Sequence, residues 1–304
     1  MRILVTGIRG QVACALAEEG AASGHEIVRL GRPDLDLAAP ANLDILLAAS
    51  RPDVIVHAAA YTAVDRAESE PDLAMAINGT AAGLLAAAAA RLDLPLIHLS
   101  TDYVFDGTKA APYLETDSTG PLGAYGRSKL AGEVAVAAAN PRHVILRTAW
   151  VYAREGANFV LTMRRLARER PELRVVGDQL GCPTYATDLA RVILAMAGRL
   201  PESPAGSDVF GIFHAAGSGE TSWAGFARAI LAHEAAKGVP PPPVVAIPSA
   251  EYPTPARRPA NSRLDCSKLN RIYGIRLPDW EEGLSRCLAR LDQAGSATGH
   301  SDIP

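Results

Sequence analysis

Short apolar runs alternate with longer helical stretches through the first half of the chain. Each run is rich in valine, isoleucine and leucine, which is typical of strands buried on both faces of a parallel sheet. The runs are ILVTG (3–7), EIVRL (26–30), DVIVHAAA (53–60), LPLIHLS (94–100) and HVILRT (143–148). Their alternation with helices predicts an α/β fold, a doubly wound parallel sheet of the Rossmann-like kind.

Helical segments connect these runs. Helices are expected near 11–19, 43–49, 71–91 and 125–138. Pro71 suits the first turn of its helix, because the N–H that proline lacks has no partner at that position. This order of elements predicts that residues 1–150 form a dinucleotide-binding domain.

The alternation is weaker after Trp150. LRVVGD (173–178) and VFGIFHAAG (209–217) predict strands, and a helix capped by Thr221 or Ser222 follows them. The next segment contains four consecutive prolines, which cannot continue a helix or a central strand. They predict a loop before the apolar run VVAIP.

Residues 151–304 are expected to form mainly a smaller substrate-binding domain. No linker separates it from the first domain, so the two are expected to be interwoven, with returns to the first domain near 185–215 and 240–250. The last helix is expected over 279–291. Residues 294–304 are small and polar and are expected to be frayed.

Composition narrows the class of protein. The chain has 304 residues, of which 48% are hydrophobic and 21% charged, and its net charge is −3. This is ordinary for a globular protein and gives no sign of nucleic-acid or membrane binding. The longest apolar run, 82–90, is too short to span a bilayer, and the N-terminus lacks a signal-peptide pattern. We therefore expect a cytoplasmic protein.

The four cysteines lie far apart, without a CxxC pair or a histidine at ligand spacing. Their spacing predicts reduced core residues rather than disulfides or a metal site. They are Cys14, Cys182, Cys266 and Cys287.

A glycine turn joins the first strand to the first helix in TGIRGQVA (6–13). Gly7 allows a tight turn, and Gly10 allows the backbone to approach a pyrophosphate at the helix N-terminus. Ala13 replaces the third glycine of the usual fingerprint but is still small. A plain strand–helix turn would look similar, but its place at the start of a βαβ pattern favours a dinucleotide site.

The second strand ends with Arg32 where NAD-binding proteins usually carry an acidic residue. A guanidinium suits the 2′-phosphate of NADPH, so NADPH is preferred over NADH as the expected cofactor. Asp34 and Asp36 leave NADH open. The third strand ends in HAAAYT (57–62), whose small residues allow a nucleotide to lie against the backbone or simply pack tightly.

Tyr125 and Lys129 are four residues apart in YGRSK, so they share one face of a helix. A free phenol has a pKa of about 10, and a nearby ammonium is expected to lower that pKa toward the range useful for acid catalysis. Thr101, at the end of its strand, lies where parallel sheets bind ligands, and its hydroxyl can orient a carbonyl. The combination predicts a proton donor, although YxxxK alone is common.

These motifs resemble the extended short-chain dehydrogenase/reductases, and more specifically the dTDP-4-dehydrorhamnose reductase family. The segments that carry the closer resemblance are GQV (10–12), HAAAYTAVDRAESEP (57–71), STDYVFDG (100–107), PLGAYGRSKLAGE (121–133), RTAWVY (147–152) and YPTPARRPANSRLD (252–265). The resemblance covers about residues 1–291. It implies hydride transfer from NADPH to the C4 ketone of dTDP-4-dehydro-β-L-rhamnose, which gives dTDP-L-rhamnose for cell-surface polysaccharides.

The resemblance also implies roles for individual residues. Tyr125 is the expected proton donor, Lys129 holds the nicotinamide ribose, and Thr101 polarises the carbonyl. The expected cofactor contacts, besides Gly7, Arg32, Tyr125 and Lys129, are Gly10, Gln11, Val12, Asp36, Leu37, Ala60, Tyr61 and Thr62. The expected substrate contacts are Thr101, Asp102, Trp150, Arg257, Arg258 and Arg263, and the arginines are candidates to pair with the diphosphate.

Two positions depart from the family pattern. His57 stands where relatives usually carry asparagine, and we interpret it as a neutral structural residue. Ala15 stands where some relatives place an acidic ligand for Mg²⁺ at a dimer interface. No metal is therefore expected, and the chain is expected to be a monomer or a homodimer.

Other activities on the same scaffold differ in sequence features. A dehydratase of this fold needs an Asp–Glu pair after the threonine, whereas here Asp102 is followed by Tyr103, and epimerases lack the segment PTPARRPANSRL (253–264) in this form. A 4-keto reductase for another deoxysugar nucleotide, of the dihydrostreptose type, would look much the same. A non-catalytic NADP-binding regulatory subunit would keep the fold without turnover.

Overall fold

The computed structural model describes residues 1–238 and 240–298. In this part of the chain, six parallel strands form one sheet in the order β10-β5-β4-β3-β1-β2. The strands are β1 (Arg2–Thr6), β2 (Glu26–Leu30), β3 (Val54–His57), β4 (Leu96–Thr101), β5 (His143–Thr148) and β10 (Gly211–His214). The α/β fold with a doubly wound parallel sheet is confirmed.

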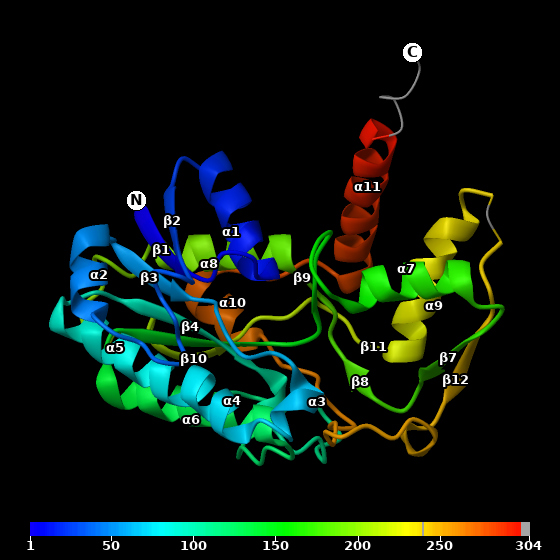
Figure 1. Cartoon of the computed structure of the whole chain (residues 1–304), viewed down its shortest axis with the longest axis horizontal. Coiled ribbons are helices and arrows are strands. Elements are labelled where there is room, and N and C mark those ends of the chain that lie inside the picture. Colours follow the sequence, from blue (N-terminus) through cyan, green and yellow to red (C-terminus); the bar gives the residue numbers. More distant parts are fainter. Residues whose placement is uncertain (239, 299–304) are drawn as a thin grey trace.

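Helices cover both faces of this sheet (Figure 1). One layer contains α1 (Gln11–Ala22) and α8 (Ala186–Ala197), which contact each other. The other contains α2 (Leu43–Ser50), α5 (Ala81–Arg91) and α6 (Ala124–Ala139). The inner strands β1, β3, β4 and β5 are therefore buried on both sides, which explains their nearly continuous apolar runs, whereas the edge strand β2 is only partly buried.

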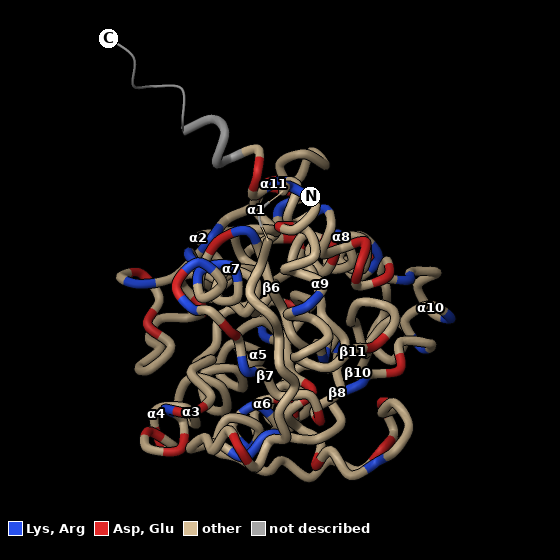
Figure 2. Tube along the Cα trace, turned by 90° about the vertical axis from the view of Figure 1, so that its right-hand side faces the viewer, with Lys and Arg blue, Asp and Glu red and all other residues tan. Residues whose placement is uncertain are grey.

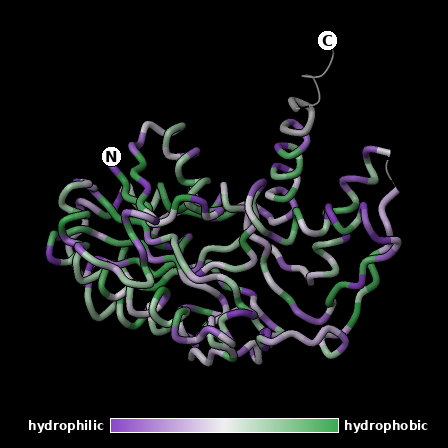
Figure 3. The backbone as a smooth tube through the Cα atoms, in the orientation of Figure 1, coloured by the Kyte–Doolittle hydropathy of each residue, from purple (hydrophilic) through white to green (hydrophobic). Residues whose placement is uncertain are grey.

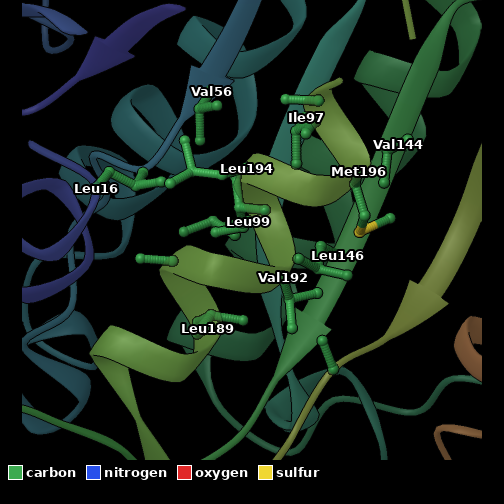
Figure 4. Packing of buried hydrophobic residues seen from close by; sticks show 14 of the residues in the cluster. Leu16, Val56, Ile97, Leu99, Val144, Leu146, Leu189, Val192, Leu194 and Met196 are labelled. Carbon is green, nitrogen blue, oxygen red and sulfur yellow. The ribbon is translucent and has the colours of Figure 1, made fainter. Parts of the chain in front are cut away.

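The core between the sheet and α8 is made of aliphatic side chains. Leu189 and Met196 of α8 pack with Val56, Ile97 and other strand residues (Figure 4). Hydrophobic residues are concentrated in the sheet and in the helices that cover it (Figure 3). Because β10 pairs with β5, the segment from α8 to β10 is part of the same layered unit as the first 150 residues.

The predicted helix at 71–91 is divided by a π turn. It consists of α4 (Pro71–Met75), the π-helical turn Ala76–Thr80, and α5. Helix α6 packs very closely here, since a Cβ added at Gly132 would lie 2.2 Å from the carbonyl oxygen of Asn78. Single π turns of this kind occur often at functional sites.

Taken as one stretch, Pro71–Arg91 has 21 residues, and an 18-residue window within it has a mean hydropathy of 1.6, enough by length and composition alone to cross a membrane. The expectation that the apolar run here is too short is therefore wrong. Half of that window is buried inside the protein, and α5 packs on α6. It has the character of a core helix.

The second half of the chain builds a separate group of smaller elements. They are β6 (Val151–Tyr152), α7 (Phe159–Glu169), β7 (Leu173–Val176), β8 (Leu180–Gly181), β9 (Thr184–Tyr185), β11 (Thr221–Ser222), α9 (Trp223–Ala235), β12 (Val244–Ile247) and α11 (Trp280–Thr298). Helix α10 (Ser267–Tyr273) packs instead on β10 of the large sheet. Helices α7, α9 and α11 enclose an aromatic core that includes Tyr152, Phe226 and Trp280. The oxygen of Ser222 accepts a hydrogen bond from the N–H of Gly225, so Ser222 is the cap of α9.

Two boundary predictions are corrected here. Strand β12 pairs with β7 in a two-stranded parallel sheet, so residues 240–250 do not return to the large sheet. Helix α11 continues to Thr298, whereas fraying was expected from residue 294. Residues 299–304 of that expected tail lie outside the described residues.

Helix α11 is tied to the unit built on the large sheet by ion pairs. Arg290 binds Glu18 of α1 at 2.5 Å, and Arg286 binds Asp188 of α8 at 2.6 Å. The last helix therefore joins the two parts of the molecule. On the side of the molecule seen in Figure 2, basic and acidic residues are interspersed.

A buried ion pair lies between α6 and β5. Arg147 donates two hydrogen bonds to the carboxylate of Glu133, at 2.9 and 2.6 Å, and both side chains are 3% exposed. Ser100 of β4 donates to the same carboxylate. Together with the bond from Ser100, this bidentate pair fixes α6 against β4 and β5.

Removing one partner of a buried pair leaves the other charge uncompensated. We expect Glu133→Gln to lower the free energy of unfolding by about 3–5 kcal/mol, measured by urea denaturation. As a control, Glu169→Gln breaks an exposed pair with Arg165 and should cost no more than about 1 kcal/mol. Equal effects of the two variants would contradict this role of Glu133.

Candidate functional site

The site lies beyond the carboxyl ends of the central strands. After β2 the chain returns to the other side of β1 to form β3, which makes a topological switch point of the kind that binds ligands. Gly7 has a φ of +101°, a conformation open mainly to glycine. Its N–H donates to the carbonyl of Leu30 at 2.6 Å, so the turn is held against β2.

The N-terminus of α1 is open. Gly10 is its N-cap residue, makes no side-chain cap, and has no atom within 4 Å of the place where a Cβ would be. The first turn contains no acidic residue. The unpaired N–H groups and the helix dipole can therefore receive a phosphate group. Val12 is partly buried in this turn, while the side-chain oxygen of Gln11 accepts from Asn158 at 3.1 Å.

The expected cofactor residues in the loop after β2 differ in their exposure to solvent. Arg32 is exposed, Leu37 is buried, and the carboxylate of Asp36 accepts the N–H of Ala38 at 3.0 Å. Arg9 was missed by the sequence reasoning. It is exposed between the two glycines of the turn, and a cation at that place in TGIRGQ was the signal that could have identified it.

The segment after β3 is held by the π turn. The side-chain amide of Asn78 pairs with the backbone N–H and carbonyl of Tyr61, at 2.8 and 3.0 Å. The hydroxyl of Tyr61 donates to Glu70 at 2.5 Å, and this bond raises the pKa of Tyr61. Ala60 is partly buried beside it, and Thr62 is exposed.

Thr101 and Tyr125 meet where β4 ends and α6 begins. The first N–H of α6, from Ala124, donates to Glu68 at 2.7 Å, which fixes the start of the helix. The hydroxyl of Thr101 makes a hydrogen bond with Tyr125. The ring of Tyr103 lies edge-on to that of Tyr125, with centroids 5.6 Å apart.

Lys129 is buried one turn further along α6. Its Nζ donates to the carbonyl of Leu99 at 2.6 Å and lies 3.4 Å from Nε2 of His98. Burial lowers the pKa of Lys129 to about 8, an effect that the carboxylate of Glu133 partly opposes. His98 was also missed by the sequence reasoning, because a histidine within a buried strand resembles any core residue.

The pKa of Tyr125 moves in the opposite direction to the expected one. Burial raises the pKa of Tyr125 to about 12, the bond with Thr101 opposes this rise, and the charge of Asp102 adds to it. The expectation that Lys129 lowers this pKa is wrong for the protein without ligands. The ammonium of Lys129 is bound to the backbone of β4, and desolvation of the phenol dominates.

Asp102 is a buried carboxylate in the same site. It is 2% exposed, its Oδ1 accepts from Thr101 at 2.9 Å, and its Oδ2 has no hydrogen-bond partner among the described residues. Burial raises the pKa of Asp102 to about 6, and hydrogen bonds from Ser262 and Thr101 oppose this rise. An unpaired buried oxygen of this kind is available to a ligand hydroxyl.

The candidate substrate arginines have different surroundings. Arg258 binds Asp65, in the short helix α3 (Val64–Ala67), at 2.8 Å, and Arg263 binds Glu220 at 2.7 Å. Arg257 is exposed. Two of the three arginines therefore hold their loop in place, and Arg257 is the one whose guanidinium is open to solvent.

The family comparison agrees with this geometry. The family model described as "RmlD substrate binding domain" matches residues 1–293. A dTDP-4-dehydrorhamnose reductase of Sinorhizobium fredii is 54% identical over 96% of this chain and 98% of its own length. The chain belongs to the dTDP-4-dehydrorhamnose reductase family.

Other members of this reductase family show the same relation. The enzyme of Escherichia coli is 43% identical over 96% of the chain and 98% of its own length. A crystal structure of the Bacillus anthracis reductase in complex with NADP has a TM-score of 0.87 and 35% identity, covering 95% of this chain and 99% of that one. The Clostridium acetobutylicum reductase has a TM-score of 0.88 and 36% identity, covering 96% and 100%.

The two departures from the reductase pattern are visible in the structure. His57 is 1% exposed, its Nδ1 lies 2.7 Å from the hydroxyl of Thr6, and burial lowers its pKa to about 3. It is therefore neutral, as expected. Ala15 is buried in the core between α1 and α8, and the described residues contain no group of three metal-ligating side chains.

Asp102 makes the stability of the protein depend on pH. Because its folded pKa of about 6 is above the ordinary value of 3.8 for an aspartate, the native state binds the proton more tightly, and this stabilisation is lost as pH rises through 6. We expect Asp102→Asn to be more stable relative to wild type at pH 7.5 than at pH 4, by up to ~3 kcal/mol. Urea unfolding at both pH values measures this.

The matched control is Asp208→Asn, at an exposed position. Its stability relative to wild type should not change between the two pH values. A difference for Asp102→Asn that is the same at pH 4 and pH 7.5 would contradict the raised pKa of Asp102.

Proposed function

We propose that the chain is an NADPH-dependent reductase that converts dTDP-4-dehydro-β-L-rhamnose to dTDP-L-rhamnose. The observation that carries this proposal is that Thr101, at the end of β4, interacts with Tyr125, while Lys129 one turn further along α6 is bound to Leu99 of the same strand. Membership of the reductase family supplies the substrate class. The nucleotide base and the stereochemistry at C4 rest on that membership.

The residues present fit a nicotinamide dinucleotide. Gly10 leaves free space over the unpaired N–H groups of α1, which suits a pyrophosphate. Exposed Arg32 and Arg9 offer positive charge near the end of β2 and in the glycine turn, which suits a 2′-phosphate. When bound, NADPH supplies the hydride.

Thr101 and Tyr125 act on the oxygen at C4. Thr101 orients the ketone oxygen through its hydroxyl, and Tyr125 donates its phenolic proton to that oxygen as negative charge develops on it. With a pKa of about 12, Tyr125 holds its proton throughout the neutral range. An alkoxide is a stronger base than a phenolate, so the transfer is favourable once the hydride has moved.

The remaining roles follow from position. Lys129 holds a ribose hydroxyl with the hydrogens that its bond to Leu99 leaves free, and Asp102 accepts a sugar hydroxyl. Trp150 packs on the sugar, and Arg257 pairs with the diphosphate. We assign residues 1–150 and the β10 region to cofactor binding and most of 151–293 to substrate binding, in a cytoplasmic monomer or homodimer.

The deciding experiment uses purified protein with dTDP-4-dehydrorhamnose and NADPH. We expect stoichiometric oxidation of NADPH and dTDP-L-rhamnose as the product, identified by NMR. Tyr125→Phe should lose about 10²–10⁴-fold in kcat, because only the transferable proton is removed, and should still bind NADPH. No net oxidation would indicate an epimerase, a dehydratase or a regulatory subunit, and a different product sugar would indicate another 4-keto reductase.

Cofactor preference is tested at Arg32. A charge-assisted hydrogen bond contributes about 1.5–3 kcal/mol, so Arg32→Ala should weaken NADPH binding by roughly ten- to a hundredfold and leave NADH binding unchanged. Isothermal titration with each cofactor measures this. Arg271→Ala, on α10 beside the opposite edge of the sheet, is the control. An unchanged NADPH affinity in the Arg32 variant would assign the phosphate to another cation, with Arg9 the first to test.

A further inference from the structure

Trp150 has an unusual backbone conformation. It follows β5, and its φ is +48°, a left-handed conformation that is costly for a bulky side chain. Strain of this kind persists only where the surrounding structure enforces it, and it is concentrated at functional sites. Trp150 lies two residues beyond Thr148, which is in register with Thr101 on the neighbouring strand.

Two residues enforce this conformation. The ring of Trp223 lies flat on the ring of Trp150, with centroids 3.4 Å apart and an interplanar angle of 7°. Gly181 lies against the same indole, since a Cβ added there would be 2.3 Å from Cε2 of Trp150. Any side chain at position 181 would collide with the indole of Trp150, so this position requires glycine.

Backbone pairing brings these two residues together. Strand β11 pairs antiparallel with β8, so that Thr221 lies opposite Gly181 and Trp223 follows two residues later. Phe159 of α7 packs against the ring of Trp223 at 4.7 Å. The position of Trp223 is therefore set by a rigid part of the second unit.

On the side away from β11, strand β8 is hydrogen-bonded to residues 260–262, next to the catalytic site. The N–H of Leu180 donates to Ala260, and the N–H of Ser262 donates to Leu180, both at 2.8 Å. Ser262 in turn makes a hydrogen bond with Asp102. Strand β8 thus connects the tryptophan pair on one side with the residue next to Thr101 on the other.

We propose that Trp223 is a positioning residue that acts through Trp150. Together with Gly181 it holds the indole of Trp150 in one orientation, so that the part left exposed packs against the apolar C–H face of the deoxysugar while the ketone lies at Thr101 and Tyr125. This inference rests on the proposed function. It adds a specificity role for Trp223 and Gly181, neither of which touches the reacting atoms.

The first test is kinetic. Trp223→Ala should raise the KM for the sugar nucleotide about tenfold, since aromatic stacking and the restraint on Trp150 are both lost. The Kd for NADPH should not change. Trp223→Phe should recover most of the loss, because a phenyl ring still stacks on Trp150. A KM that is unchanged in Trp223→Ala would overturn the proposal.

The second test is spectroscopic and needs no substrate. The sequence has three tryptophans, and the third, Trp280, packs edge-on to Phe226. If Trp150 and Trp223 are stacked, the electronic transitions of their indoles are coupled and give a shared near-ultraviolet circular dichroism signal. Trp150→Phe and Trp223→Phe should each remove that signal. The double variant should remove no more than either single variant. Trp280→Phe is the control and should act additively.

Each outcome has one meaning. Additive spectra for Trp150→Phe and Trp223→Phe would refute the stacked pair itself. A wild-type protein inactive on dTDP-4-dehydrorhamnose would refute the proposed function and leave the spectra to decide the stacking. If Trp223→Ala does not fold, Gly181→Ala replaces it, and that variant should raise the same KM because its Cβ displaces the indole.

Discussion

The buried ammonium of Lys129 is the interaction on which the arrangement of the site depends. Its bond to the carbonyl of Leu99 fixes α6 on β4, and four residues later Glu133 fixes the same helix to β5 through Arg147. Two charged groups within one helical turn therefore determine where Tyr125 lies. Because both are desolvated, their partners must be well placed for the native state to accommodate them.

Much of the fold could be predicted from the sequence because the inner strands of the sheet are buried on both faces. The segments that form β1 to β5 are rich in valine, isoleucine and leucine, a composition typical of strands in a parallel sheet. The short strands after Trp150 have only two to four residues each, and so little periodicity that their partners could not be assigned. The pairing of β12 with β7 depends on tertiary packing that no local pattern encodes.

The candidate site shows the same division. Gly7, Thr101, Tyr125 and Lys129 follow a spacing that carries its own chemical reason, and the structure brings Thr101 and Tyr125 together. The pKa of Tyr125 could not be predicted from the sequence, because it depends on how deeply the phenol is buried. Likewise, the partners of Arg258 and Arg263 are Asp65 and Glu220, far away in sequence, so their roles in holding the loop were visible only in three dimensions.

The contact between Glu18 and Arg290 joins residues 272 positions apart. During synthesis, the first helix therefore leaves the ribosome long before Arg290. Of the two arginines that pair with Glu18 among the described residues, only Arg154 is made earlier. The contact between α11 and α1 through Arg290 can consequently form only after nearly the whole chain has been made.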